Sequence, residues 1–186
     1  GLFKPGAATN RRKNLYPGKT VCTFALGDEE ALRFLADAPD ICFRPAAYTN
    51  LPSVIAQNEN MVSVNTALQV DLLGQISSET IGSRQYSGTG GAMDFACGAH
   101  SAPNGRSVIA VSATARGGSV SRISAALPSG SAVSIPRNIV DYVVTEFGIA
   151  RLRGCSVRQR VENLIAVAHP DFRAELAREA RQMLLW

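Results

Sequence analysis

The chain has 186 residues, of which 46% are hydrophobic, and its formal net charge is +4. A chain of this length buries about 70% of the surface that it exposes when unfolded, which suits one domain with a single core. Aromatic residues make up only 6% of the chain, and the basic residues are spread along it apart from Arg11 to Lys13. Because the sequence lacks a stripe of basic and aromatic side chains, we expect no nucleic acid partner.

The cysteines lie far apart in the sequence, at Cys22, Cys42, Cys97 and Cys155. None belongs to a Cys-x-x-Cys or Cys/His ligand pattern, so we expect free thiols, no metal site and no disulfide framework.

No apolar run approaches the roughly 20 residues that span a bilayer, and the first residues lack the pattern of a signal peptide. We therefore expect a cytoplasmic protein without membrane contact.

The first predicted elements are a strand and a helix. Residues 20–25 are apolar and β-branched, and glycines flank them, which is typical of a short buried strand. Asp28 is placed to cap a helix, because its carboxylate would accept hydrogen bonds from the unpaired amides of the first turn. We expect this helix to bury Leu32 and Leu35 and to end before Pro39.

The middle of the chain continues the alternation of strands and helices. Residues 41–44 predict a second strand, and a proline at position 52 opens a helix over 52–57. Residues 61–73 alternate between apolar and polar, as on one face of a sheet, and this region could pair antiparallel with a neighbour. Residues 82–106 are rich in glycine and show little periodicity, which predicts a long loop.

The last part of the chain predicts further strands at residues 107–113, 132–135 and 140–144, and then two helices. Ser156 is placed to cap the first of these helices and Asp171 the second. The alternation of strands with helices predicts an α/β fold, with a mostly parallel sheet layered with helices.

The most distinctive segment is residues 87–95, Ser-Gly-Thr-Gly-Gly-Ala-Met-Asp-Phe. Gly88, Gly90 and Gly91 would let backbone amides approach a ligand without side chains in the way. Such amides bind a phosphate, or the oxyanion that forms when a nucleophile attacks an acyl carbonyl, and glycine clusters also serve tight turns alone. The spacing is not that of a dinucleotide-binding loop, no clear helix is predicted to follow, and the lysine of a P-loop is absent.

Six further segments of the sequence, together with the glycine loop, follow one another in an order that is typical of one known protein family. They are 48–50 (Tyr-Thr-Asn), 57–65 (Gln-Asn-Glu-Asn-Met-Val-Ser-Val-Asn), 70–75 (Val-Asp-Leu-Leu-Gly-Gln), 121–123 (Ser-Arg-Ile), 143–150 (Val-Val-Thr-Glu-Phe-Gly-Ile-Ala) and 168–173 (Ala-His-Pro-Asp-Phe-Arg). With them the chain resembles, from about Pro17 to Arg181, the C-terminal domain of the acetyl-CoA hydrolase/transferase family. That family includes 4-hydroxybutyrate, butyrate and acetate CoA-transferases.

The resemblance implies a fold of the NagB/RpiA/CoA-transferase type. It implies that residues 17–186 form the C-terminal domain and that residues 1–16 are a linker from an N-terminal half, which would act in cis or in trans. The expected ligands are coenzyme A, as an acyl-CoA thioester, and a small carboxylate. We also expect a homo-oligomer.

In this family a glutamate carboxylate attacks the acyl-CoA thioester, which is covalent catalysis. The family implies that the amides of Gly90 and Gly91 line the oxyanion site. Its nucleophilic glutamate lies in a His/Tyr-Thr-Glu motif of the N-terminal half, and the present sequence has no such motif. Ala92 is a second departure, since relatives carry glutamine there, but backbone amides do not depend on that side chain.

The resemblance also implies which residues contact coenzyme A. Asn50 and Gly88 would lie against the molecule, and Arg116 with Gly117 would approach its phosphates. Arginine suits phosphate because its planar guanidinium donates paired hydrogen bonds. Arg122 and Arg137 are alternative phosphate contacts, although arginines at strand ends are commonly plain surface residues.

Several acidic residues and a histidine allow other roles. Glu59, Glu79 and Glu146 are conceivable substitute nucleophiles, but a structural hydrogen bond is the commoner role for such residues. His100 could contact substrate or simply be solvated, and Asp94 could orient the glycine loop by accepting its amides.

The leading hypothesis is the coenzyme A-binding half of an acyl-CoA:carboxylate CoA-transferase, inactive by itself. One alternative is half of an acyl-CoA hydrolase, in which water takes the acyl group. The other is a catalytically silent module that binds coenzyme A or assists assembly.

Overall fold

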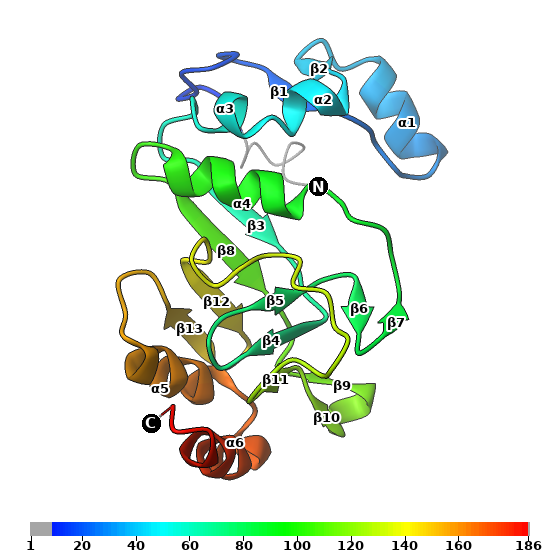
Figure 1. Cartoon of the computed structure of the whole chain (residues 1–186). Helices are drawn as coiled ribbons and strands as arrows, with labels where there is room; N and C mark the ends of the chain where they lie inside the picture. Colours follow the sequence, from blue (N-terminus) through cyan, green and yellow to red (C-terminus); the bar gives the residue numbers. More distant parts are fainter. Residues whose placement is uncertain (1–8, 186) are drawn as a thin grey trace.

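The computed structural model describes residues 9–185 and consists of short strands and helices in alternation (Figure 1). The helices are α1 (Glu29–Ala36), α2 (Ala46–Thr49), α3 (Pro52–Ile55), α4 (Ala92–Ser101), the 3₁₀ turn η1 (Arg116–Gly118), α5 (Val157–Val167) and α6 (Pro170–Gln182). The strands are β1 (Thr20–Cys22), β2 (Ile41–Phe43), β3 (Val62–Asn65), β4 (Gln69–Asp71), β5 (Ile76–Ser77), β6 (Thr80–Ile81), β7 (Arg84–Gln85), β8 (Arg106–Ala110), β9 (Thr114–Ala115), β10 (Val120–Ser121), β11 (Ile123–Ser124), β12 (Tyr142–Thr145) and β13 (Gly148–Arg151).

The largest sheet has four strands in the order β13-β12-β8-β3. Strands β3, β8 and β12 run parallel, and β13 returns antiparallel to β12 through a tight turn. A second sheet, β11-β4-β5, combines one parallel and one antiparallel pair. The α/β prediction is confirmed, and three adjacent strands of the largest sheet pair in parallel.

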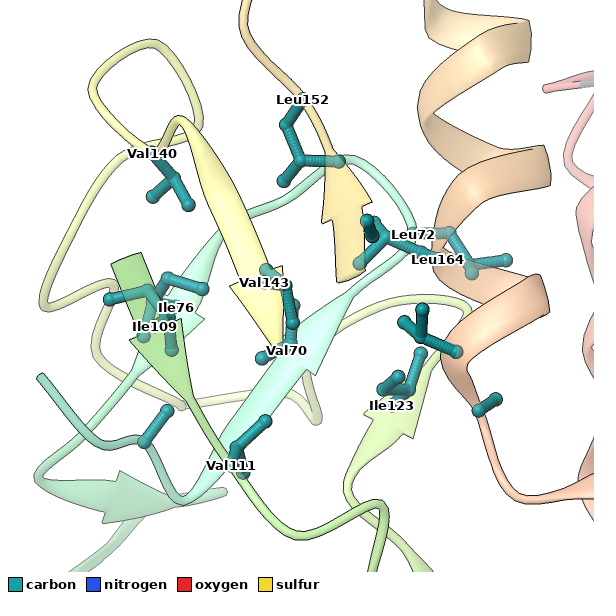
Figure 2. Close-up of a cluster of buried hydrophobic side chains, with 14 of the residues drawn as sticks. Val70, Leu72, Ile76, Ile109, Val111, Ile123, Val140, Val143, Leu152 and Leu164 are labelled. Atoms are coloured by element: carbon teal, nitrogen blue, oxygen red, sulfur yellow. The ribbon is translucent and has the colours of Figure 1, made fainter. Parts of the chain in front are cut away.

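The core lies between the two larger sheets and α5 (Figure 2). Its fully buried side chains come from β4, β5, β8, β11, β12 and α5 and from connecting segments, which supply Leu72, Ile135, Val140 and Leu152. The largest are Val70, Leu72, Ile76, Ile109, Ile123, Ile135, Val140, Val143, Leu152, Val161 and Leu164. Each such side chain stabilises the fold by roughly 1.5–3 kcal/mol relative to an exposed position, so this cluster holds the domain together.

The region predicted as one long loop, residues 82–106, is wrong in its central part. Strand β7 and the ten-residue helix α4 lie within it. Helix α4 buries Ala96, Gly98 and Ala99, and Ala96 belongs to the core cluster. The sequence signal is weak because the buried side chains are small and a glycine in a helix interior costs about 1 kcal/mol relative to alanine.

Two further strand predictions need correction. Residues 61–73 are not one strand but β3 and β4, which belong to different sheets. Residues 132–135 form no strand, since only Ile135 makes an isolated bridge, to Ile76. Its backbone exchanges two hydrogen bonds with Ile76, and Pro136, which has no amide hydrogen, follows directly.

Helix caps are predicted with mixed success. Asp28 caps α1 by accepting from the amide of Ala31, and Ser156 forms a capping box with Gln159 on α5. The prediction of Asp171 as a cap is wrong: His169 caps α6, because a proline occupies the first helical position after it.

The unit made of β1, α1 and β2 packs loosely. The strands form a separate parallel pair, and α1 has no buried residue. The prediction that Leu32 is buried is wrong, since it is 52% exposed, and Leu35 is only partly buried. Apolar side chains of this unit therefore remain open to contact.

All four cysteines are free thiols, as expected. Within residues 9–185 no helix is long and apolar enough to cross a membrane. The same residues contain no group of three or more histidine, cysteine, aspartate or glutamate side chains that could hold a metal ion.

We predict that replacing Gly98 with alanine destabilises the domain. A methyl group at this position would overlap the Ile55 side chain and lie 3.1 Å from the carbonyl oxygen of Pro52. Such overpacking costs about 1–3 kcal/mol. The matched control is Gly88→Ala, because a methyl group there meets no atom within 4 Å. Denaturant unfolding should show a lower midpoint for Gly98→Ala alone; equal stability of the two variants would contradict the close packing of α3 on α4.

Candidate functional site

The glycine loop borders an open cavity of about 250 Å³. Residues 87–93 form one side of the cavity. The other lining residues are Asn65, Thr66, Ser78, Glu79 and Ser134. The sequence identified the loop but not its partners, because Ser134 is distant in the chain and no local motif connects it with the loop.

The loop amides are available to a ligand. Among the described residues, the amides of Gly88, Thr89, Gly90 and Gly91 donate no hydrogen bond. None of the three glycines has a positive φ, so no left-handed turn requires them. A methyl group at 88 or 90 would meet no neighbouring atom. The loop therefore presents bare backbone beside a cavity rather than a tight turn closed on itself.

Helix α4 begins directly at the end of this loop. Gly91 is its N-cap, and no side chain caps it. The first amides of a helix have no partner within the helix, and the helix dipole places partial positive charge at this end. The expectation that no helix follows the glycines is wrong, and the helix adds anion-binding capacity to that of the loop.

Asn50 lies against Gly91. The residue ends α2, and its side-chain amide is so close that a methyl group at position 91 would overlap it. The hydroxyl of Thr49 lies 3.0 Å from its carbonyl oxygen, which restricts the orientation of the amide. The structure thus brings together Gly91, which the sequence offers as part of the glycine loop, and Asn50, which the family resemblance implies as a coenzyme A contact.

Glu79 fastens the glycine loop to the rest of the domain. Its carboxylate accepts hydrogen bonds from the hydroxyls of Thr89 at 2.9 Å and Ser134 at 3.0 Å, and from the side-chain amide of Gln85 at 3.4 Å. Its backbone carbonyl accepts from the amide of Tyr86 at 2.7 Å. Because three donors engage the carboxylate, it is a poor candidate for a free nucleophile.

Asp94 is the residue that the sequence offers as one possible anchor for the loop. Its carboxylate makes no hydrogen bond within residues 9–185, so it does not accept the loop amides. It lies in the first turn of α4, where its charge suits the helix dipole. Glu79, rather than Asp94, holds the loop.

Arg116 and Gly117 do not line the glycine-loop cavity. They form η1 in the turn between β9 and β10, where both have positive φ, 50° and 66°. The Arg116 side chain is exposed and makes no ion pair within the described residues. It is free to meet an anion, but at a place separate from the loop (Figure 1).

The other polar candidates make structural contacts. Nδ1 of His100 lies 3.2 Å from the buried carboxylate of Asp141, which also accepts from the amide of Ser107. Arg122 donates to the backbone carbonyls of residues 67, 68 and 114, so it clamps strands together. Arg137 is exposed, and its carbonyl accepts from Arg160.

Glu146 has a structural partner as well. It accepts a 2.8 Å hydrogen bond from the amide of Ala113. Its own backbone amide and then that of Ala113 lower the pKa of its carboxyl group. The side chain of Glu59 is exposed.

The thiol of Cys97 lies on α4. Burial raises the pKa of this thiol, and the charge of Asp94 adds to the effect. Cys97 is therefore depleted of the thiolate that a nucleophile requires.

We predict that Glu79→Ala loosens the glycine loop without unfolding the domain. Loss of the three side-chain hydrogen bonds should speed hydrogen–deuterium exchange at the amides of Tyr86 and Ser87, which donate to the backbone carbonyl of Glu79, by at least about tenfold, since each bond contributes about 1 kcal/mol or more. Glu175→Ala, at an exposed position of α6, is the control and should change exchange only locally. Unchanged exchange at these two loop amides would show that the Glu79 side chain does not anchor the loop.

Comparisons with known proteins show which family the chain belongs to. The chain is 50% identical over 182 residues to succinyl-CoA:cyclohexane-1-carboxylate CoA transferase of Geobacter metallireducens, covering 98% of the chain and 42% of that protein. It is 46% identical over 181 residues to 4-hydroxybutyrate coenzyme A transferase of Clostridium kluyveri, covering 97% and 42%. RipA from Yersinia pestis has a similar structure, with a TM-score of 0.92 and 45% identity over 100% of the chain and 42% of RipA.

The chain thus spans less than half the length of these relatives. Residues 27–180 match the acetyl-CoA hydrolase/transferase C-terminal domain. The match covers most of the chain, and it includes the segments and the glycine loop described above. The chain belongs to the acetyl-CoA hydrolase/transferase family and represents its C-terminal domain.

Proposed function

We propose that this domain is the coenzyme A-binding half of an acyl-CoA:carboxylate CoA-transferase and provides the oxyanion site of that enzyme. The observation that carries the proposal is the row of unpaired amides at residues 88–91, which lines a cavity and leads into the uncapped start of α4. Few arrangements of neutral protein groups suit a developing oxyanion better than fixed backbone donors beside a helix N-terminus.

The proposed role of the loop is to stabilise the tetrahedral intermediate. A carboxylate attacks the thioester carbonyl carbon, the carbonyl oxygen becomes an oxyanion, and the amides of Gly90 and Gly91 donate to it. The carbon–sulfur bond then breaks, and coenzyme A leaves as the thiolate while an acyl–carboxylate anhydride remains. In other enzymes one such donor contributes about 3–4 kcal/mol to the transition state.

The proposed nucleophile is a glutamate from the N-terminal half. The three candidate carboxylates on this domain are a poor replacement: Glu79 is held by three donors, Glu146 accepts from a backbone amide, and Glu59 does not line the glycine-loop cavity. The domain alone is accordingly expected to bind coenzyme A and to lack transferase activity. Half of a hydrolase would share this division of labour, with water in place of the acceptor carboxylate.

Asn50 and Arg116 are proposed to hold two parts of coenzyme A. The Asn50 amide lies beside Gly91, where it would contact the end of the molecule that carries the thioester. Arg116 is exposed on a separate turn and would meet the phosphates. Gly88 would leave room for the ligand, because nothing occupies the space beside its α-carbon.

The proposal predicts that coenzyme A binds the isolated chain in calorimetric titration. Asn50→Ala and Arg116→Ala should each weaken binding by roughly tenfold or more, because a hydrogen bond to a charged or buried partner contributes about 1.5–3 kcal/mol. Asn138→Ala and Arg178→Ala, at exposed positions outside the site, are the matched controls and should leave binding unchanged.

Two results would contradict this function. One is the absence of coenzyme A binding by a folded chain, which would favour a silent assembly module. The other is normal acyl transfer by the chain alone, since that would place a nucleophile on this domain. Product analysis with and without acetate, in the presence of the N-terminal half, separates transferase from hydrolase.

A further inference from the structure

The four-stranded sheet has one face that the described residues leave uncovered. In-register partners on neighbouring strands point to the same side of a sheet, and successive residues alternate between sides. The register Val64↔Val108↔Tyr142↔Arg151 therefore defines one face. We call this the open face. Its side chains belong to Val62, Val64, Arg106, Val108, Ala110, Tyr142, Val144, Ile149 and Arg151.

The opposite face is the one that the domain itself covers. Ile109, Val143 and Ala150 point to that side and are fully buried in the core. Helix α4 packs there over β8 and β3, and α5 packs over β13 and β12, because Ala96 of α4 and the buried residues of α5 belong to the same core cluster (Figure 1).

The open face is apolar and exposed. Seven of its nine side chains are apolar or aromatic, and Val62, Val64 and Ile149 are 48%, 64% and 69% exposed. None of its side chains is fully buried. Sheets built from parallel strands are normally covered on both faces, and large exposed apolar patches mark interaction sites. If the open face were always exposed to water, its side chains would be expected to be mostly polar.

The charges on the open face indicate the chemistry of its partner. Arg106 and Arg151 are exposed on it and form no ion pair with any described residue, and none of the nine open-face residues carries a carboxylate. Two copies packed through this face would share it by symmetry and bring like charges together. A partner with apolar side chains at its centre and carboxylates at its rim fits better.

We propose that the open face is the docking surface for the N-terminal half of the transferase, which would cover it with an apolar layer and place carboxylates near Arg106 and Arg151. This inference rests on the proposed function. It is supported by the relatives' length: the domain is C-terminal in the family, and 58% of the Geobacter and Clostridium proteins lies outside the matched region.

The test uses the chain together with the N-terminal half of the Geobacter metallireducens relative, produced separately. Association is measured by calorimetry and size-exclusion chromatography. Val64→Asp and Ile149→Asp, both at exposed positions, should weaken the complex by at least tenfold, and Arg106→Glu should weaken it more strongly at low salt than at high salt. Leu184→Asp is the control, because Leu184 is 90% exposed and lies outside the open face. Circular dichroism verifies that each variant is folded.

The outcomes separate this inference from the proposed function. A complex that Val64→Asp and Ile149→Asp leave unchanged would overturn the docking surface, while its acyl transfer and the coenzyme A titration would still support the function. A chain that dimerises alone, and becomes monomeric with Val64→Asp, would assign the face to a second copy and overturn the inference. Absence of any complex would overturn it too, and the titration of the isolated chain would then decide the function independently.

Discussion

The close approach of Gly91 to the side-chain amide of Asn50 is the constraint on which the candidate site depends. It requires α3 to pack directly on α4 and the end of α2, at Asn50, to lie beside Gly91. Gly98 allows this packing because it has no side chain to separate α4 from Ile55. The same packing fixes where α4 begins, and hence where its unpaired amides lie. Two glycines on one helix thus connect the packing of the fold with the chemistry proposed for the loop.

The sequence predicted the α/β class, the capped helices α1 and α5 and the regions of β1, β2, β3, β4, β8 and β12, because these elements carry local signals: alternation, β-branched runs and cap residues. It did not predict the remaining, mostly two-residue strands. It did not predict α4, whose buried residues are alanine and glycine and give almost no helical periodicity. The glycine loop was identified from its own residues, and Asn50 from the resemblance to the family. The anchoring role of Glu79 was missed, because it depends on Ser134 and Thr89, which only the folded chain brings together.

The domain is well packed in its centre and incomplete at its surface. Its core side chains are fully buried, whereas the open face and the β1-α1-β2 unit expose apolar residues. A half of a larger enzyme would have these properties, because it folds around its own core while the surfaces that contact the other half stay exposed until that half binds. The division proposed for catalysis follows the same line: backbone donors on one half and the nucleophile on the other.

The central claim is that the bare amides at residues 88–91 face the thioester of a bound acyl-CoA. Nuclear magnetic resonance of the ¹⁵N-labelled chain, titrated with acetyl-CoA and with coenzyme A, tests it most directly. The account predicts that the amide resonances of Gly88, Gly90 and Gly91 shift in both titrations and differ between the two ligands, because only one of them carries the carbonyl group. Resonances of these glycines that stay unchanged while others respond to coenzyme A would contradict it.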